Sequence, residues 1–436
     1  MIRDRRAILA LLTALNFLNY LDRYVVAAVL APMMRELSLS NFEGGLLQSA
    51  FLIGYFATSP LFGARADKAA RKGLIALGIA IWSAATFASG LAWGFWSLLA
   101  ARAMVGVSEA SFAALAPTII DDLTPPDRKA KALAVFYLAT PVGSALGYVV
   151  GGMIAKHWDW RASFFATGGP GLALALLCLL IVEPPRKLVD VRTKLLDGLR
   201  EVAAIPLVRR AALGYCAFTA AVGAFSFWAP KFLLEQFPKE LDLKTANFWF
   251  GAVLVPAGVI STLLGGWWAD RSLRKLPPPP DGAPYDAPEH KAAVNAQLRV
   301  CAIGMVIATP LAVLCFFVET PVAFFTLTFA VEIGLFLSAS PVNAAFLRAV
   351  PVERRASAMA ASVFAIHLFG DLWSPPALGL LKDALPDHIT IAMMAIPLTF
   401  GVSAYLWWPR KREASGPSSG ASRHGGLPEA RVHATT

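Results

Sequence analysis

The sequence predicts an all-α membrane protein in which twelve transmembrane helices form two pseudo-symmetric six-helix bundles. Composition gives the first reason: the 436 residues are 57% hydrophobic and only 16% charged, whereas charged residues make up about 25% of an ordinary soluble domain. Apolar stretches long enough to cross a bilayer, which takes about 20 residues, give the second reason. A charged segment that occurs twice gives the third, because it separates these stretches into two sets of six. The stretches cover residues 7–34, 42–64, 73–93, 95–121, 132–156, 162–182, 211–234, 246–269, 299–318, 321–347, 356–381 and 389–408.

The repeated segment is a loop sequence that follows the second apolar stretch and returns after the eighth. Gly63–Lys72 reads GARADKAARK and Gly266–Lys275 reads GWWADRSLRK, with glycine, aspartate and basic residues at the same spacing. A second pair, Pro125–Ala132 and Pro351–Ala358, follows the fourth and the tenth stretches. The two copies of this second pair are separated by 23 residues more than the two copies of the loop. The Pro-rich insertion Leu276–Leu298 has the same length and accounts for the difference. Duplicated membrane halves are typical of proteins that rock one half against the other about a central site.

The placement of basic residues predicts the orientation of the chain. The formal net charge is +10, but 30 of the 39 Lys and Arg residues fall in the N-terminus, the loops after even-numbered stretches and the C-terminal tail. This is the bias of the positive-inside rule, so we expect both termini in the cytoplasm and no nucleic-acid partner. The first apolar stretch is long enough to span the bilayer and no small-residue cleavage site follows it, so we interpret it as a retained helix rather than a signal peptide.

The predicted domains are two bundles joined by a linker. Apolar residues from Leu188 to Val202 follow a helical stripe, which fits either a helix at the membrane surface or a solvated linker helix. The Pro-rich insertion should be extended and mobile, and the Gly/Ser/Arg-rich tail should be disordered. The boundaries are 1–182 for the N-terminal bundle, 183–210 for the linker, 211–409 for the C-terminal bundle with the insertion at 276–298, and 410–436 for the tail.

Four charged residues, Asp22, Arg23, Arg102 and Glu109, lie inside the first and fourth stretches. A charge at the centre of a bilayer costs about 2.5 to 3.5 kcal/mol even on insertion scales, so these side chains should face one another or a water-filled cavity. Arg102 and Glu109 are separated by two helical turns, about 10.5 Å along one helix face, with Gly106 leaving room between them. Two acids and two arginines suit proton coupling and the binding of an anionic group. A permanent ion-pair network that braces the two helices is the alternative.

The second half carries a different polar set. His367 and Asp371 lie four residues apart on one helix face, and the run Ser374–Pro376 should bend the helix after them. They form either a second polar site or a packing contact in which a carbonyl satisfies the histidine. Glu332 has no evident partner in the sequence, and we predict that it lines the cavity because an acid inside the membrane is functional by default.

The repeated loop resembles the loop signature of the major facilitator superfamily, whose members have twelve helices in two bundles. Arg102–Gly106 resembles that superfamily's fourth-helix motif, and Pro141–Gly152 is similar to its fifth-helix antiporter motif. The loop departs from the signature at Ala70, where glycine is usual, and at Lys68, where arginine is commoner. The resemblance implies a latch between the bundles on the cytoplasmic side. The implied latch residues are Gly63, Asp67, Lys68, Arg71, Arg128, Asp270, Arg271 and Arg354.

A narrower resemblance is carried by five segments, which are Asn19–Tyr24, Arg102–Ser111, Ala116–Asp122, Phe136–Tyr148 and Ile366–Pro376. In these segments the chain resembles the Spinster family of lipid transporters, and it is identified as a bacterial Spinster-like protein of the inner membrane. The resemblance implies proton-linked movement of a lysophospholipid or a sphingosine phosphate-like amphiphile. It also implies that the four charged residues of the first and fourth stretches form the family's polar cluster.

Two alternatives to lipid transport stay open. A proton-coupled symporter of small organic anions has a similar first helix, and only the run His367–Pro376 argues clearly against it. A membrane receptor that transports nothing is also compatible with the sequence. An intramembrane protease, by contrast, would need a motif such as His-Glu-x-x-His or Gly-x-Ser-Gly, and the sequence has neither. We therefore expect no catalytic residues and no enzyme activity.

The aromatic and cysteine residues bear on partners and cofactors. The 28 Phe and 12 Trp residues could line an apolar cavity while Arg23 or Arg102 binds a phosphate, although aromatics in membrane helices also pack or face lipid. Cysteines occur at 178, 216, 301 and 315 without paired spacing, which predicts neither disulfides nor a metal site. We expect a monomer that contacts membrane lipids, protons and a small amphiphilic or anionic substrate, with a proton gradient as energy source and no cofactor. The candidate cavity residues are Tyr20, Phe51, Tyr137 and Trp228.

Overall fold

The computed structural model describes residues 1–66, 70–125, 128–183, 204–278, 280, 284–351 and 354–410, and nearly all of them are helical. The N-terminal half has six membrane crossings, as the sequence predicts. The first crossing consists of two helices that meet at Val29, whose backbone leaves the helical conformation. The helices are α1 (Arg5–Ala28), α2 (Leu30–Leu37), α3 (Asn41–Ala66), α4 (Arg71–Gly90), α5 (Phe95–Leu123), α6 (Lys129–His157) and α7 (Trp160–Leu179).

The C-terminal half adds six more crossings, three of which are divided into shorter helices. The eleventh is interrupted by η3, a single π-helical turn between α14 and α15. The helices are α9 (Pro206–Gln236), α10 (Leu243–Leu273), α11 (Pro288–Cys315), α12 (Pro321–Phe336), α13 (Ala339–Arg348), α14 (Arg355–Ile366), η3 (His367–Asp371), α15 (Ser374–Ala384), α16 (Ile389–Met393) and α17 (Ala395–Trp407).

Nine helices of the described part are long and apolar enough to span a membrane. The crossings that contain α1 and η3 are not among the nine, and neither is α3. Polar residues such as Asp22 and Arg23 interrupt the apolar sequence of α1, and η3 divides the eleventh crossing into two short helices. Both interruptions fall at predicted site residues. The same chemistry that weakens these helices as membrane spans therefore marks them as candidates for the inner wall.

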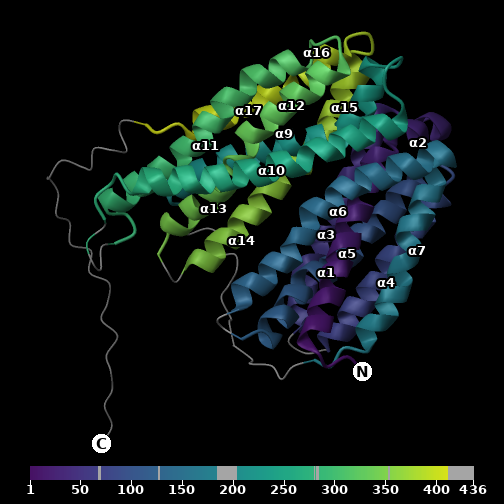
Figure 1. Ribbon diagram of the computed structural model, residues 1–436, viewed down its shortest axis with the longest axis horizontal. Coiled ribbons are helices and arrows are strands. Elements are labelled where there is room, and N and C mark those ends of the chain that lie inside the picture. Colours follow the sequence, from purple (N-terminus) through teal and green to yellow (C-terminus); the bar gives the residue numbers. More distant parts are fainter. Residues whose placement is uncertain are drawn as a thin grey trace, which may run out of the picture.

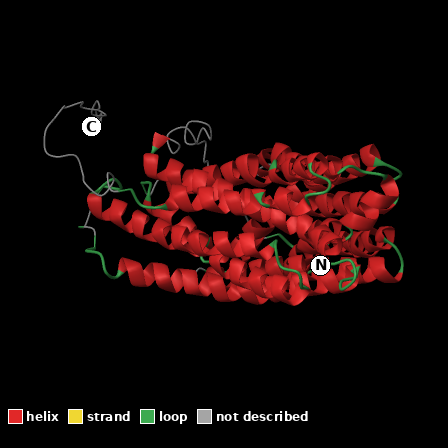
Figure 2. Cartoon of the chain, turned by 90° about the horizontal axis from the view of Figure 1, so that it is seen from above, coloured by secondary structure: helices red, strands yellow, loops and turns green. Residues whose placement is uncertain are grey.

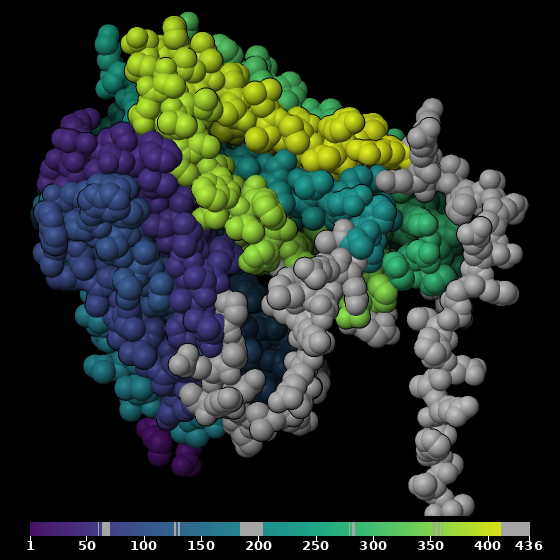
Figure 3. Space-filling view, turned by 180° about the vertical axis from the view of Figure 1, so that it is seen from behind, coloured from purple at the N-terminus to yellow at the C-terminus, as the bar shows by residue number. Residues whose placement is uncertain are grey.

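The two halves touch at one end and diverge at the other. They meet around α2, α15 and α16 and separate toward α13 and α14 on one side and the chain N-terminus on the other (Figure 1). Seen from above, the helices run along the long direction of the molecule, with the loops gathered at its ends (Figure 2). In the space-filling view the yellow-green residues near 380 press against the purple N-terminal residues (Figure 3). We call the end with α2, α15 and α16 the sealed end.

Contacts between the halves at the sealed end include charged and amide groups. Lys156, in the last turn of α6, lies with its Nζ 3.4 Å from a carboxylate oxygen of Asp242, which caps α10. The Asn247 side-chain amide in α10 donates a hydrogen bond of 3.0 Å to the Ala28 carbonyl at the end of α1. The molecule is therefore closed at this end, while the halves stand apart at the end that carries the N-terminus.

The structure corrects one prediction about the connecting segments. The insertion 276–298 is not extended throughout, because α11 begins at Pro288 and its first turns belong to the insertion. Proline is well tolerated at the first position of a helix, where its missing N–H would have no partner. The predicted linker helix lies mostly in residues 184–203, outside the described residues, and α9 begins at Pro206. The tail beyond residue 410 also lies outside them.

Candidate functional site

The centre of the site is an ion pair between α1 and α5. The Arg23 guanidinium Nη2 lies 2.7 Å from Glu109 Oε2, and the Glu109 side chain is fully buried while that of Arg23 is 19% exposed. Gly106 allows this approach, because a Cβ atom there would lie 1.9 Å from the Phe51 carbonyl oxygen of α3. The room predicted between Arg102 and Glu109 is thus filled by the α3 backbone. Close packing of α3 on α5 brings Glu109 within reach of α1.

Aromatic rings support both arginines. The Arg23 guanidinium carbon lies 4.7 Å from the centroid of the Phe51 ring, 4.9 Å from that of Tyr20 and 5.7 Å from that of Tyr55. The Arg102 guanidinium lies 5.2 Å from the centroid of the same Phe51 ring. Cations over ring faces are stabilised by about 0.5 to 2 kcal/mol, more when they are desolvated. Phe51 is itself fully buried beneath the two guanidinium groups and is not among the residues that line the cavity.

Asp22 and Arg102 are the least satisfied charged residues of the group. Both side chains are fully buried. Within the described part of the chain, neither carboxylate oxygen of Asp22 and none of the three Arg102 side-chain nitrogens has a hydrogen-bond partner. Leaving a charged group unpaired in an apolar interior is costly. Asp22 can lower that cost by binding a proton, whereas Arg102 stays charged and can lower it only by gaining a new partner.

A cavity of about 240 Å³ lies between the two halves. Arg23 and Tyr20 reach it from α1, while His367 and Asp371 reach it from the eleventh crossing. The structure therefore brings residues of both halves to one space. The sequence pattern did not single out the other polar lining residues, although Gln48 is an unusual amide inside a membrane helix. The lining consists of Tyr20, Arg23, Tyr24, Ala27, Gln48, Leu52, Thr219, Val222, Gly223, Ser226, Phe227, His367 and Asp371.

The two polar residues from the second half form a pair on η3. His367 Nδ1 lies 2.9 Å from one Asp371 carboxylate oxygen and 3.0 Å from the other. π-helical turns are found frequently at functional sites. The His367 ring centroid lies 5.0 Å from that of Phe56 in α3, so the pair borders the opposite half. The helix is interrupted by η3 just before the prolines, and α15 begins at Ser374.

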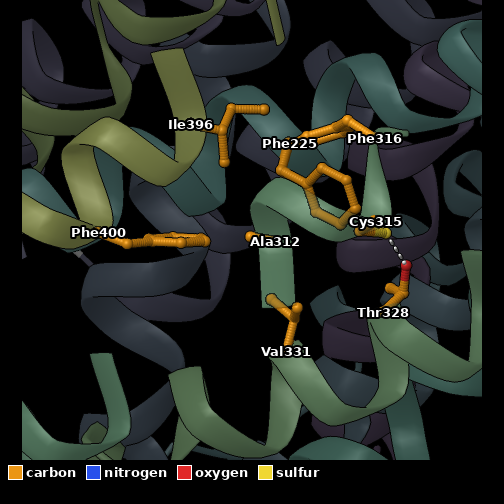
Figure 4. A pocket seen from close by; sticks show the side chains of 8 residues that line it. All are labelled: Phe225, Ala312, Cys315, Phe316, Thr328, Val331, Ile396 and Phe400. Atoms are coloured by element: carbon orange, nitrogen blue, oxygen red, sulfur yellow. Dashed lines mark hydrogen bonds between the residues drawn. The ribbon is translucent and has the colours of Figure 1, made fainter. Parts of the chain in front are cut away.

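Glu332 lies apart from this cavity. It is buried in α12, its Oε2 has no hydrogen-bond partner among the described residues, and it is not one of the lining residues. A neighbouring hole of about 10 Å³, large enough for one water molecule, lies between α12, α11 and α17. There the Cys315 sulfur lies 3.3 Å from the Thr328 hydroxyl (Figure 4). Glu332 is thus a buried acid of α12 that does not line this cavity.

The four aromatic residues predicted to line the cavity lie in different surroundings. Of the four, Tyr20 lines the cavity, and Phe51 lies beneath the arginines. Tyr137 is about half exposed, with its ring against Phe136. Trp228 is fully buried near the sealed end, where its indole N–H donates a hydrogen bond of 2.9 Å to the Pro375 carbonyl.

The described residues of the implied latch are distributed over both halves. Arg71 is bound inside its own half, 2.7 Å from an Asp122 carboxylate oxygen, 3.8 Å from Glu183 and 3.0 Å from the Thr118 hydroxyl.

The other described latch residues belong to α10 or directly precede α6 and α14. Asp270 is exposed, and the Arg271 guanidinium lies 5.6 Å from the Trp267 ring centroid. Arg128 and Arg354 precede α6 and α14 and interact with other residues. Asp67, Lys68 and the surroundings of Gly63 lie outside the described residues.

The fold and the central cavity define the class of the protein. The sequence model of the Major Facilitator Superfamily matches residues 12–375. The chain is therefore a multi-pass membrane transporter of this superfamily and not an enzyme. The repeated loops and the two six-helix bundles agree with this assignment.

Relatives narrow the class to one family. Protein spinster homolog 1 of Homo sapiens is 33% identical over 402 residues, which cover 87% of this chain and 73% of that protein. Protein spinster homolog 3 of Danio rerio is 32% identical over 418 residues, covering 89% and 79%. The probable sphingolipid transporter spinster homolog 2 of Arabidopsis thaliana is 29% identical over 439 residues, covering 92% and 86%. The chain belongs to the Spinster family.

A solved structure supports the same fold. The crystal structure of a bacterial homolog to the human lysosomal transporter Spinster, in an inward-facing and unoccupied conformation, superposes with a TM-score of 0.81. It is 21% identical in sequence, and the match covers 95% of this chain and 99% of that one. The occupied form of that homolog gives a TM-score of 0.80. Both forms share the two-bundle architecture described above.

Proposed function

We propose that this Spinster-family transporter moves a single-chain anionic amphiphile, such as a lysophospholipid or a sphingosine phosphate-like lipid, by proton-coupled alternating access. The observation that carries the proposal is the shared cavity. Arg23 on one half and the His367–Asp371 pair on the other face the same space. A substrate bound there contacts both halves, so its binding depends on how the halves are placed.

The lining supports an amphiphile with an anionic headgroup. Arg23 is the exposed cation of the polar cluster and can bind a phosphate or carboxylate oxygen. Leu52, Val222 and Phe227 supply apolar wall for part of a hydrocarbon chain. The name of the Arabidopsis relative refers to sphingolipid transport, which agrees with this chemistry.

Glu109 is the proposed proton carrier. While ionised, it holds Arg23 at 2.7 Å, and the guanidinium then has less capacity for a substrate anion. A proton on Glu109 removes this competition and frees Arg23 for the headgroup. Asp22 and Arg102 form the deeper part of the same switch, since both are buried without partners in the described part. Protonation of Glu109 and binding of the substrate anion are thereby coupled through the same arginine.

Transport of small organic anions is the second candidate. Gln48, Thr219, Ser226 and His367 give one region of the cavity a polar lining, which suits a compact carboxylate as well as a lipid headgroup. The apolar wall residues favour the amphiphile. The two candidates differ in whether a hydrocarbon chain increases affinity.

Reconstituted transport under an imposed pH gradient tests both candidates. Proteoliposomes are loaded with labelled lysophospholipid or with a small carboxylate, and net movement is followed with and without the gradient. We expect gradient-dependent movement of the lysophospholipid. Movement of the carboxylate alone would favour the second candidate over the first. Movement of the lipid at the same rate with and without the gradient would contradict proton coupling.

The proposed orientation places both termini in the cytoplasm of a bacterial cell. Support comes from the basic residues, which are concentrated at the termini and in the loops on the same side. In this orientation the sealed end faces outward, and the conformation described here is open to the cytoplasm. Protease accessibility of the C-terminal tail in inside-out and right-side-out vesicles tests the orientation. Cleavage of the tail only in right-side-out vesicles would reverse it.

A further inference from the structure

A helix cap at the sealed end crosses from one half to the other. Asp383, in the last turn of α15, accepts hydrogen bonds from the backbone N–H groups of Asn41 at 2.9 Å and Phe42 at 2.8 Å. It also accepts one from the Asn41 side-chain amide at 2.7 Å. Asn41 and Phe42 are the first residues of α3, and the first N–H groups of a helix have no partner within that helix. A residue of the C-terminal half therefore caps a helix of the N-terminal half.

A charged group fixes the capping helix to its own half. Lys382 is buried, with its Nζ 2.9 Å from Glu235 Oε2 of α9 and 4.8 Å from the centroid of the Trp228 ring. Glu235 also pairs with Lys231, one turn before it. Lys231 Nζ donates a hydrogen bond of 3.0 Å to the Asn41 side-chain oxygen. Both α15 and α9 thus present a polar group to the start of α3.

The capping helix also connects to the cavity. α15 begins three residues after η3, which carries the cavity residues His367 and Asp371. Just before α15, the Ser49 hydroxyl of α3 donates a hydrogen bond of 2.5 Å to the Leu372 carbonyl. A Cβ atom at Gly45 would lie 2.5 Å from the Pro375 carbonyl oxygen. Because α15 starts next to the cavity residues and ends at the cap, a movement of this helix would displace both.

We propose that Asp383 is a releasable lock: it holds α3 when this end is sealed and lets go when α15 moves with the π-helical turn. The lock rests on the alternating access of the proposed function, because it must open when the halves separate at this end. A carboxylate at a helix N-terminus is favoured by the helix dipole as well as by its hydrogen bonds. Losing an ordinary cap changes an equilibrium about fivefold, which is enough to bias two conformations without fixing either.

Distance measurements between the halves test the lock without any substrate. Spin labels are attached to Gly94→Cys and Glu319→Cys, in loops of the two halves at the sealed end. A Cβ at Gly94 would meet nothing within 4 Å, and the four native cysteines are buried. We expect Asp383→Ala to increase the population with this end open about fivefold. Asp387→Ala removes the same charge from an exposed residue of the next loop and should leave the distance distribution unchanged.

Exchanging the carboxylate and the amide between residues 383 and 41 distinguishes loss of the lock from a folding defect. Asp383→Asn should open the sealed end partly. Adding Asn41→Asp should restore the sealed population, because the carboxylate then lies on α3 and the amide on α15, so the two side chains can still form a hydrogen bond. An unchanged distribution in Asp383→Ala, an equal shift in Asp387→Ala, or no rescue by the exchange would overturn the lock. Failure of lipid transport by the wild type, with these distances behaving as expected, would instead contradict the proposed substrate and leave the lock standing.

Discussion

The two halves share an architecture but hold different chemistry. In the N-terminal half, Arg23 and Glu109 form an ion pair on regular helices, and Glu109 is fully buried. In the C-terminal half, His367 and Asp371 pair on a π-helical turn, and their side chains are 30% and 20% exposed. A buried ion pair is disrupted at high cost when one partner loses its charge, whereas a partly hydrated pair responds weakly. We therefore propose that the switch lies in the first half and that the second half supplies an adjustable wall.

The largest expected effect comes from the buried acid of the first half. Glu109→Gln keeps the shape of the side chain but removes its charge and its ability to carry a proton. We expect gradient-driven transport to fall at least tenfold while the protein still folds, because Arg23 is then permanently released. Transport by reconstituted protein, with and without a pH gradient, measures this loss.

Glu332→Gln is the matched control in the second half. Glu332 is also a buried acid inside the membrane, but it does not line the cavity. The variant should keep most of the gradient-driven transport. Equal loss in both variants would erase the contrast between the halves and make Glu332 part of the coupling machinery.

A smaller effect is expected from the ring beneath the arginines. Phe51→Leu removes the aromatic face that both guanidinium groups contact, at about 0.5 to 2 kcal/mol per contact. We expect substrate affinity to fall roughly threefold to tenfold, seen as a higher KM in the transport assay. Phe112→Leu changes a buried ring of the same bundle that packs on Trp82 with a centroid distance of 5.7 Å. If Phe112→Leu lowers affinity as much, the effect reflects packing and not the arginines.

The pair on the π-helical turn should respond more weakly than Glu109. Asp371→Asn removes the negative charge beside His367 Nδ1 but keeps an oxygen that can accept a hydrogen bond. Because the pair is partly exposed, we expect a rise in KM of only about threefold with little change in the maximal rate. A loss of gradient dependence in this variant would move the switch from the first half to the second.

The smallest effect concerns a cap at the sealed end. The Thr245 backbone N–H donates to Asp242 at 2.8 Å and holds the pKa of that carboxyl below its ordinary value of 3.8. The stabilisation is therefore fully present above pH 3.8 and is lost as pH falls through the lower folded-state pKa. At pH 7, Asp242→Ala should reduce stability by about 1 kcal/mol.

Thermal unfolding in detergent measures the Asp242 effect, and its dependence on pH checks the cause. The difference in melting temperature between wild type and Asp242→Ala should shrink only at strongly acidic pH. A difference that disappears already near pH 6 would show that another group, and not the Asp242 carboxylate, is responsible.

The sequence allowed the crossings and the charged residues to be predicted because those signals are local. Apolar length and the repeated loops define the helices, and the cost of a charge in the bilayer singles out Asp22, Arg23, Arg102 and Glu109. The extended form of the insertion was predicted wrongly for residues after Pro288, because proline ends a helix in its interior but begins one readily. That Glu332 does not line the cavity was not predictable, because a single helix does not reveal what packs against it.

By itself, the sequence determined the two halves and the family to which the chain is similar. It also determined the helix faces on which the charged side chains lie, because the spacing of residues along a helix sets the direction in which each side chain points from the helix axis. Only the tertiary structure decided the partners. Arg102 and Glu109 share a helix face, yet Glu109 pairs with Arg23 on another helix, because Gly106 brings the α3 backbone between them. The cap that Asp383 gives to α3 likewise joins residues more than 340 positions apart, a contact that depends on how two bundles meet and leaves no periodic signal in the chain.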